Sequence, residues 1–411
     1  MLDSADILIV GCHDPVNLQK MEFELKKPWS NIGFTVIYLD HNATTPIAPE
    51  VLEAMMPYLT TEWGNPSSSY RFGSKLKSVI EKAREQTADL LGAHPLDIIF
   101  TSCGTESNNT AISAALEANP HKKHIITSQV EHSAILNHFK ALETKGYTVT
   151  YLPVNRDGQL DLEIFQKVLI DDTAVVSLMW ANNETGVIFP VKSIGEICRA
   201  RGVLFHCDAA QAVGKIPIRL KDFPVDYLSF TGHKIHAPKG VGALYVRRRA
   251  PYSSYLFGGH QERGRRGGTE SVHLIAGLEA AARISLKGVQ GYENSVAPIR
   301  DLFEQELFNI SNKLQVNGHR TIRLANTSNI SFLGIESEAL LLLLDQAGIC
   351  ASRGSACLAD MEEPSHVIYA MTSDKDLSNQ AIRFSFGKDS TYKEAKMCLQ
   401  ALGTAMRSLL K

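Results

Sequence analysis

The chain has 411 residues, of which 44% are hydrophobic and 21% are charged, and its formal net charge at pH 7 is −2. This length is enough for a large buried core and predicts two domains, or one large and one small. The 42 basic and 44 acidic residues nearly balance, which excludes a global charge that would attract nucleic acid or a membrane surface. No apolar run approaches the ~20 residues of a membrane-spanning helix.

The cysteines point to a reducing environment. There are seven of them, an odd number, and none forms a C-x-x-C pair, which argues against a disulfide framework and against a structural zinc site. We therefore expect a cytoplasmic protein without a metal site. Cys103, Cys198, Cys207 and Cys350 lie in apolar or strand-like surroundings, which predicts small buried side chains.

Residues 1–36 differ from the rest of the chain. Asp6–Cys12 (DILIVGC) is typical of a short buried strand, but charged and irregular sequence follows it. The segment is not a signal peptide, because its start is acidic, its apolar core is too short, and it lacks a small-residue cleavage site. We interpret it as an accessory N-terminal extension.

An alternation of strands and helices begins after the first 36 residues. A short strand leads into Pro46 and Pro49, and a helix is expected from about Glu50; Ser74–Leu91 then carries apolar residues at helical spacing. The alternation that follows predicts a parallel sheet wrapped by helices. Strands are predicted at 97–101, 125–128, 147–154, 174–179, 203–207, 227–230 and 241–246.

The sequence changes character after about Val296. It predicts a helix, then a strand in 324–334, a leucine-rich helix at 339–346, and a closing strand at 381–386. This pattern is typical of a smaller α+β domain. The predicted division is an extension at 1–36, a large domain at 49–295, and a small domain formed by 37–48 and 296–411.

Polar residues follow several of these strands, where open α/β sheets place their ligands. Gly104 and Thr105 start a helix directly after a strand, and backbone N–H groups there suit a phosphate, although Thr is also common as a plain N-cap. His132 ends the next strand, where a lone histidine is more often a core residue. Asn183 follows a further buried strand.

The strongest combination lies in 207–234. Asp208 ends a strand, and Gln211 follows three residues later, which turns both side chains to one side if a helical turn begins there. Lys234 stands at the lip of a buried strand. Desolvation lowers a lysine's pKa and favours a free amine that forms a Schiff base, but a surface turn is the alternative for this lysine alone. Taken together, these residues predict a phosphate-bearing pyridine cofactor, pyridoxal 5′-phosphate (PLP).

These motifs carry a resemblance that covers Ile37 to the C-terminus. They occur in order as LDHNATTP, GNPSS, FTSCGTESNN, VEH, NNETGV, DAAQAVGK, SFTGHKIHAPKG, GGHQERGRRGGTESV, RGSAC and EPSHV. The chain resembles the NifS/IscS-type cysteine desulfurases of the class V aminotransferases. The resemblance implies PLP-dependent transferase fold-type I, with a large domain built on a mainly parallel seven-stranded sheet and a smaller α+β domain.

The resemblance also implies roles for individual residues. Lys234 would form the Schiff base, Asp208 would bond the pyridine nitrogen, and Gln211 would bond the ring hydroxyl. The other expected site residues are His132 against the ring face, Gly104, Thr105, Thr231 and His233 at the phosphate, Thr269 from the partner subunit of a homodimer, and Asn42, Asn183 and Arg383 at the substrate, L-cysteine, with the Arg383 fork on its carboxylate.

Cys357 would be the nucleophile. It stands in a Gly/Ser/Ala-rich loop (Ser352–Cys357), a setting typical of an exposed, reactive thiol; an inert loop cysteine is the alternative until the PLP site is admitted. Its thiolate would take the substrate sulfur as a persulfide and leave alanine. The following segment, Leu358–Glu362, is bulkier and more acidic than is usual in the family, and Arg353 replaces a small residue. These departures bear on the delivery partner and not on the chemistry.

Three functions remain in competition. The first is a homodimeric L-cysteine desulfurase that passes sulfur to an acceptor protein, either an iron–sulfur scaffold or a thiolation relay. The second is a selenocysteine lyase, which shares nearly every cofactor residue. The third is a non-catalytic scaffold, against which the joint presence of Lys234, Asp208, His132 and Cys357 argues. We expect the one basic cluster, Arg263, Arg265 and Arg266, to line the inter-subunit site and not to bind nucleic acid.

Overall fold

Seven strands form the main sheet of the computed structural model, which describes residues 36–354 and 364–410. Their order is β2-β8-β7-β6-β5-β3-β4, and only β8 runs antiparallel to its neighbours. This confirms the predicted mainly parallel seven-stranded sheet. The strands are β2 (Ile98–Thr101), β3 (His124–Ser128), β4 (Thr148–Leu152), β5 (Thr173–Met179), β6 (Leu204–Asp208), β7 (Tyr227–Thr231) and β8 (Gly242–Val246).

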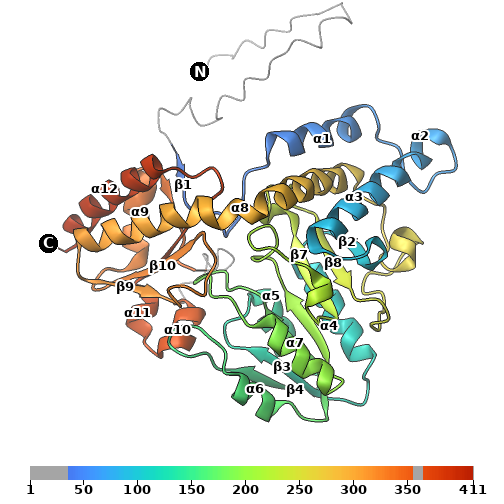
Figure 1. Cartoon of the computed structure of the whole chain (residues 1–411), viewed down its shortest axis with the longest axis horizontal. Helices are drawn as coiled ribbons and strands as arrows, with labels where there is room; N and C mark the ends of the chain where they lie inside the picture. Colours follow the sequence, from blue (N-terminus) through green and yellow to red (C-terminus); the bar gives the residue numbers. More distant parts are fainter. Residues whose placement is uncertain (1–35, 355–363, 411) are drawn as a thin grey trace, which may run out of the picture. The chain divides into compact units, whose positions relative to one another are not determined.

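Helices cover both faces of this sheet (Figure 1). On one face, α4 (Gly104–Glu117) and α5 (Ser133–Glu143) bury apolar side chains against Ile125, Val175 and Leu244. On the other face, α7 (Val191–Ala200) and α3 (Leu76–Leu91) pack on a larger core. Strands buried on both faces require near-continuous apolar runs, and that requirement made them readable in the sequence.

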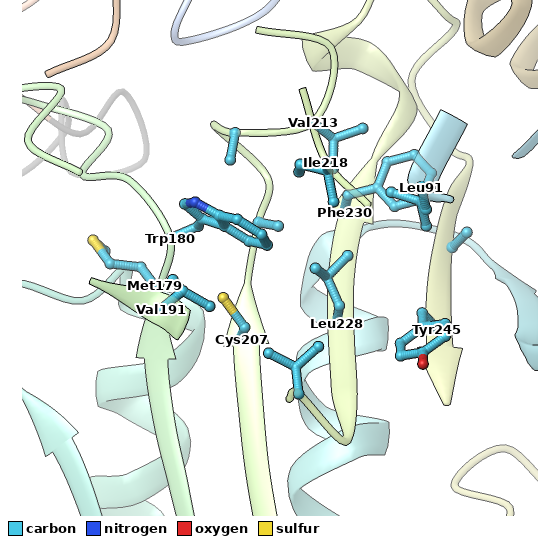
Figure 2. Close-up of a cluster of buried hydrophobic side chains, with 14 of the residues drawn as sticks. Leu91, Met179, Trp180, Val191, Cys207, Val213, Ile218, Leu228, Phe230 and Tyr245 are labelled. Carbon is cyan, nitrogen blue, oxygen red and sulfur yellow. The ribbon is translucent and has the colours of Figure 1, made fainter. Parts of the chain in front are cut away.

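Alternation along the strands separates the core from the polar edge. Figure 2 shows Met179, Cys207, Leu228, Phe230 and Tyr245, from four neighbouring strands, in one apolar cluster with Trp180. Successive side chains of a strand point to opposite faces. Within β6, Asp208 follows Cys207 and therefore points to the opposite face of the sheet from this core.

A second core forms around a smaller sheet with the order β12-β10-β9, which is antiparallel throughout. Phe303 lies 4.9 Å from Phe384 and 5.5 Å from Phe386 between ring centroids at its centre. The remaining elements of this part are β1 (Ile37–Tyr38), which pairs with β11 (Ile349–Cys350), β9 (Leu314–Asn317), β10 (Thr327–Phe332), β12 (Ala381–Ser385), α9 (Ser337–Gln346), α10 (His366–Thr372), α11 (Lys375–Asn379) and α12 (Tyr392–Leu409).

One helix belongs to both cores. Helix α8 (Val272–Ile310) buries Ile275 and Leu278 in the larger core and Phe303 and Leu307 in the smaller one. It runs without a break through Val296, and the predicted domain limits stay a prediction. The other helical elements are α1 (Pro49–Thr60), α2 (Arg71–Ser74), α6 (Leu162–Val168), and the short 3₁₀ turns η3 (Pro95–Asp97), η4 (Leu220–Asp222), η5 (Gly232–Lys234) and η6 (Gln261–Gly264).

Two predictions fall on residues that the structure does not describe, and two predictions about cysteines need correction. The strand predicted at Asp6–Cys12 and the thiol of Cys357 lie outside the described residues. Cys198 and Cys207 are buried as predicted, but Cys103 and Cys350 are partly exposed, because one precedes a helix at a pocket wall and the other ends a two-residue strand. In the part of the chain that the structure describes, no helix combines the length and apolarity needed to cross a membrane.

A buried ion pair ties the arginine-rich loop to the sheet. Arg84, 1% exposed, donates two hydrogen bonds to Glu262, at 2.6 and 2.8 Å. The same carboxylate accepts the backbone N–H of Phe100 at 3.0 Å. Glu262 and Arg263 both have left-handed backbone angles, with φ of 49° and 60°. The pair thus holds a strained turn against β2.

Removing one partner of this pair should be costly. Glu262→Ala removes both short bonds of the Arg84 guanidinium and leaves it with the half-exposed Glu81, at 3.3 Å from its Nε. We expect the free energy of unfolding to fall by about 3 kcal/mol in urea denaturation. The matched control is Glu62→Ala, which breaks an exposed pair with Lys75 and should cost less than about 1 kcal/mol. Equally small losses of unfolding free energy in both variants would show that the Arg84–Glu262 pair does not stabilise the fold.

Candidate functional site

Eleven of the predicted site residues line one pocket at the ends of β5, β6 and β7. The cavity measures about 190 Å³ and also has Asn108, Cys103 and Met179 in its wall. Parallel strands that end at one edge of a sheet bring together residues that are far apart in the sequence. The eleven are Asn42, Gly104, Thr105, His132, Asn183, Asp208, Gln211, Thr231, His233, Lys234 and Arg383.

Asp208 provides a fixed negative charge at the pocket. It ends β6 and is 8% exposed. One carboxylate oxygen accepts the Asn108 side-chain amide at 2.7 Å, and the other accepts the Ala210 backbone N–H at 2.9 Å. These two bonds hold the carboxylate in one orientation, which suits it to bond a protonated ring nitrogen.

The start of α4 provides hydrogen-bond donors at the other end of the pocket. The helix begins at Gly104, and its first N–H groups have no intrahelical acceptor. Glu106, the acid in this first turn, is paired with Arg266 at 2.9 and 3.1 Å. That pairing neutralises the charge that would otherwise repel an anion from the helix N-terminus.

Thr231 and His233 reach the pocket from the end of β7 and the turn after it. The His233 ring lies 3.2 Å from the Thr44 hydroxyl through Nδ1. Burial, followed by the nearby Lys234, lowers the pKa of His233 to about 4. The imidazole is therefore neutral at pH 7, and with Nδ1 at the Thr44 hydroxyl it has Nε2 left to bond in the pocket.

Lys234 lies in the 3₁₀ turn η5 and reaches back to the segment after β1. Its amine donates to the backbone carbonyl of Asn42 and, at 2.8 Å, to that of Ala43. Thr45 binds the same turn, because its backbone N–H and its hydroxyl both donate to the His233 carbonyl at 2.9 Å. The lysine thus stands in a turn that the first strand's exit holds in place.

His132 is the N-cap of α5. Its Nδ1 accepts the Ala134 backbone N–H at 3.1 Å. This bond leaves the ring proton of a neutral imidazole on Nε2. The cap fixes the position of a ring that lines the pocket.

Arg383, on β12, is a cation in the wall of the pocket. It is 1% exposed and donates to Asp40 at 2.6 Å and to the Asn183 carbonyl at 3.0 Å. Its buried Nε and the side-chain oxygen of Asn183 have no hydrogen-bond partner among the described residues. The guanidinium lines the pocket, and its fork of donors would suit a carboxylate there.

The remaining predicted residues lie elsewhere. Thr269 is exposed and does not line this pocket, and its role across a subunit interface stays a prediction. The arginine cluster is bonded within the chain: Arg263 pairs with Glu81 at 2.5 Å, and Arg265 donates to the Ile98 carbonyl at 2.9 Å. Cys357 lies outside the described residues.

Two residues of the site were missed in the sequence. Asn108 stands four residues after Gly104, and Lys215 stands four residues after Gln211. In a helical turn, residues four apart lie on one face, so this spacing was the signal that could have found both. Lys215 is buried, and its amine lies 2.6 Å from the Gln211 side-chain oxygen.

Comparisons with known proteins agree with this geometry. The family model described as Aminotransferase class-V matches residues 37–397. A cysteine desulfurase from Trichormus azollae is 52% identical over 90% of this chain and 92% of its own length. The chain belongs to the cysteine desulfurases of the class V aminotransferase family. This confirms the resemblance of the motifs.

Solved structures of the family share the fold of this cysteine desulfurase chain. A NifS-like protein superposes with a TM-score of 0.86 at 36% identity and covers 91% of this chain and 100% of its own. SspA, solved in complex with cysteine, superposes with a TM-score of 0.76 at 34% identity and covers 86% and 99%. These matches confirm PLP fold-type I.

The cofactor of this family is PLP, and the pocket fits it. A fixed carboxylate at Asp208 stands at one end, and a helix N-terminus with a neutralised acid stands at the other. The first suits a pyridinium nitrogen, and the second suits a phosphate. An amine, that of Lys234, lines the same pocket.

Glu131 is a buried acid beside this site, next in sequence to His132 and hydrogen-bonded to Met179, which both line the pocket. It is 0% exposed; one oxygen accepts the Ser128 hydroxyl at 2.8 Å and the Met179 N–H at 3.0 Å, and the other has no partner among the described residues. Burial raises the pKa of Glu131 to about 8, and the neighbouring Asp208 adds to the rise. At neutral pH the acid is therefore mostly protonated.

This shift predicts a pH-dependent stability. A carboxyl whose pKa is raised on folding stabilises the native state fully below about pH 4.5, and this contribution is lost as the pH rises towards 8. Between pH 5 and pH 8.5, the free energy of unfolding of the wild type should therefore fall relative to Glu131→Gln by on the order of 3 kcal/mol.

Urea denaturation of both proteins across this pH range measures the difference. The exposed Glu85→Gln serves as the control, and its difference from the wild type should not change with pH. A Glu131→Gln difference that is as flat as that of the control would show that Glu131 is ionised in the folded protein.

Proposed function

We propose that this chain is a PLP-dependent cysteine desulfurase that converts L-cysteine to L-alanine and transfers the sulfur through a persulfide on Cys357. The observation that carries the substrate assignment is the buried Arg383 with an unsatisfied Nε in the wall of the PLP pocket. The relative SspA, solved in complex with cysteine, supports it. No observation on this chain favours a selenocysteine lyase or a non-catalytic scaffold.

The proposed cofactor contacts follow the pocket walls. Asp208 holds the ring nitrogen, Gln211 the ring hydroxyl, and His132 the ring face. The phosphate lies among the residues at the start of α4 and the end of β7: Gly104, Thr105, Thr231 and His233. When bound, PLP supplies an aldehyde carbon that bonds to amines and a ring that accepts electrons.

The chain's own residues then divide the work. Arg383 binds the substrate carboxylate, with Asn42 and Asn183 beside it, and the Lys234 Nζ takes the proton from the substrate's α carbon. The Cys357 thiolate attacks the substrate sulfur. A sulfur–sulfur bond forms, the bond between sulfur and the β carbon breaks, and that carbon keeps the electron pair, gains a proton and becomes the methyl group of alanine.

The two chemistries should separate in variants. Cys357→Ser should bind PLP normally but form alanine at least about 100-fold more slowly, because a hydroxyl is a far weaker nucleophile than a thiolate. Lys234→Ala should lose the covalent attachment of PLP. The assays are alanine release from L-cysteine, with L-selenocysteine in parallel, and the absorbance of bound PLP.

Cys350→Ser is the control, because Cys350 is a partly exposed cysteine that does not line the pocket, and it should keep wild-type turnover. Mass spectrometry after cysteine treatment should find added sulfur on the peptide that contains Cys357. Added sulfur on another cysteine, or near-normal turnover by Cys357→Ser, would contradict the nucleophile.

We also propose a homodimer in the cytoplasm. Two segments expose large apolar side chains: Trp63 is 71% exposed after α1, and Phe257 is 85% exposed in the loop before η6. Large exposed aromatic residues are typical of interfaces. Thr269 lies twelve residues after Phe257 and is also exposed, as a residue offered to a partner subunit would be. The sulfur acceptor would be an iron–sulfur scaffold or a thiolation relay.

The dimer can be tested by charge. Phe257→Glu and Trp63→Glu should each convert the dimer to a monomer in size-exclusion chromatography with light scattering, since a carboxylate cannot be buried there without a partner. Leu342→Glu, at a site 60% exposed on α9, is the control and should remain dimeric. A wild type that is monomeric, or dimers in all three variants, would overturn the proposed interface.

A further inference from the structure

A second lysine, Lys215, lies beside the PLP pocket and has no place in the mechanism above. It follows Gly214, which has a left-handed φ of 76°, and a Cβ at that glycine would lie 2.8 Å from the Ile235 side chain. The turn therefore requires glycine. It points the next side chain inward, and Lys215 is only 6% exposed.

Lys215 contacts oxygens and no acids. Its amine donates to the Gln211 side-chain oxygen at 2.6 Å and to the Asn42 side-chain oxygen at 2.9 Å. Among the residues that the structure describes, no carboxylate pairs with it. A lysine buried at this cost without a counter-charge is rarely kept for stability alone. Burial lowers the pKa of Lys215 well below its ordinary value, and the charges of Lys234 and Arg383 lower it further.

These two bonds select the orientation of two amides. A side-chain amide has an oxygen at one end and an NH₂ at the other, and the Lys215 amine, as a donor, binds the oxygen end of both amides. Because the Gln211 oxygen faces Lys215, its NH₂ is left to donate, as it does to the Asn42 carbonyl at 3.0 Å. In the same way, the Asn42 NH₂ donates to Thr327 at 2.9 Å and to the Asn183 carbonyl at 3.2 Å.

The network leads to the cofactor site from two sides. Gln211 lines the pocket, and the Asn42 carbonyl that it binds also accepts the amine of Lys234. Lys215 thus bonds directly to Gln211, a proposed ring contact, and is connected to the cofactor lysine through one residue, Asn42. It does not line that pocket itself.

We propose that Lys215 is a positioning residue that sets the Gln211 amide with its NH₂ towards the PLP ring hydroxyl. This inference rests on the proposed function, in which Gln211 is assigned to the ring hydroxyl. A donor there stabilises the ionised oxygen of the ring, so the lysine acts on the cofactor's electronic state through the amide that it orients.

The test is a double-mutant cycle on the holoenzyme with PLP as the ligand. Lys215→Met keeps the length of the side chain but removes its donors, and Gln211→Leu removes the oriented amide. Each should raise the Kd for PLP roughly tenfold and raise the pH midpoint of the bound cofactor's absorbance by about one unit. The double variant should show no further shift, because Lys215 acts through Gln211.

Two variants serve as controls. Lys122→Met removes a half-buried lysine that bonds the Thr173 carbonyl at 3.2 Å, away from the pocket, and should leave both readouts unchanged. Lys215→Gln restores one donor and should recover part of the shift; it also decides the question if the methionine variant does not fold.

Shifts that add in the double variant would show that Lys215 acts by its charge and not through Gln211, and would overturn the proposal. So would a Lys215→Met protein with lower thermal stability but an unchanged Kd and absorbance midpoint, which would make the lysine structural only. A wild type that binds PLP but forms no alanine from L-cysteine would contradict the proposed function alone and would leave this cycle decisive.

Discussion

The site depends on one short segment, the exit from β1, and within it on Asn42. Its backbone N–H donates to the Ser385 hydroxyl of β12 at 2.9 Å, its NH₂ binds Thr327 of β10, and its carbonyl accepts Lys234. Every polar group of this residue has a partner. An asparagine satisfied on all sides is rigid, and here it connects strands of the smaller sheet to the turn that carries the cofactor lysine.

This arrangement explains how one lysine and an arginine in the pocket wall, and a second lysine beside it, are tolerated. Lys215 and Lys234 both donate to oxygens of Asn42, and Arg383 donates to the Asn183 carbonyl, which the Asn42 amide also binds. Amide and backbone oxygens thus solvate these donors in place of water. Arg383 also has a carboxylate partner, Asp40. Neutral oxygens bind a cation without cancelling its charge.

Most of the main sheet could be predicted because its strands are buried on both faces and read as apolar runs. The short strands outside the main sheet were harder to predict. Strand β11 has two residues and β9 has four, too few for a period to be read, and they exist because long-range partners such as Ile37 and Ile330 hold them. At the site, Asp208, Gln211 and Lys234 were identified through motifs. Asn108 and Lys215 were not, because their part in the site is to hydrogen-bond Asp208 and Gln211.

The sequence could not predict how the site side chains are oriented or protonated. That Gln211 presents an NH₂, that Arg383 keeps a bare Nε, and that Glu131 holds a proton all depend on neighbours from other elements. Such properties arise from burial and from the other half of each hydrogen bond, and a linear pattern contains neither. Thr269 is a further case, because its proposed role depends on a second subunit.

The shared helix and the first strand set an order of events during synthesis. The larger core needs Ile275 and Leu278 of α8, so it stays open until that helix has left the ribosome. Strand β1 waits longer, because Ile37 pairs with Ile349. Strand β1, the earliest strand among the described residues, is therefore among the last to find its neighbour, and contacts of such long sequence separation form slowly. The nascent chain must remain soluble with an open edge for most of its translation.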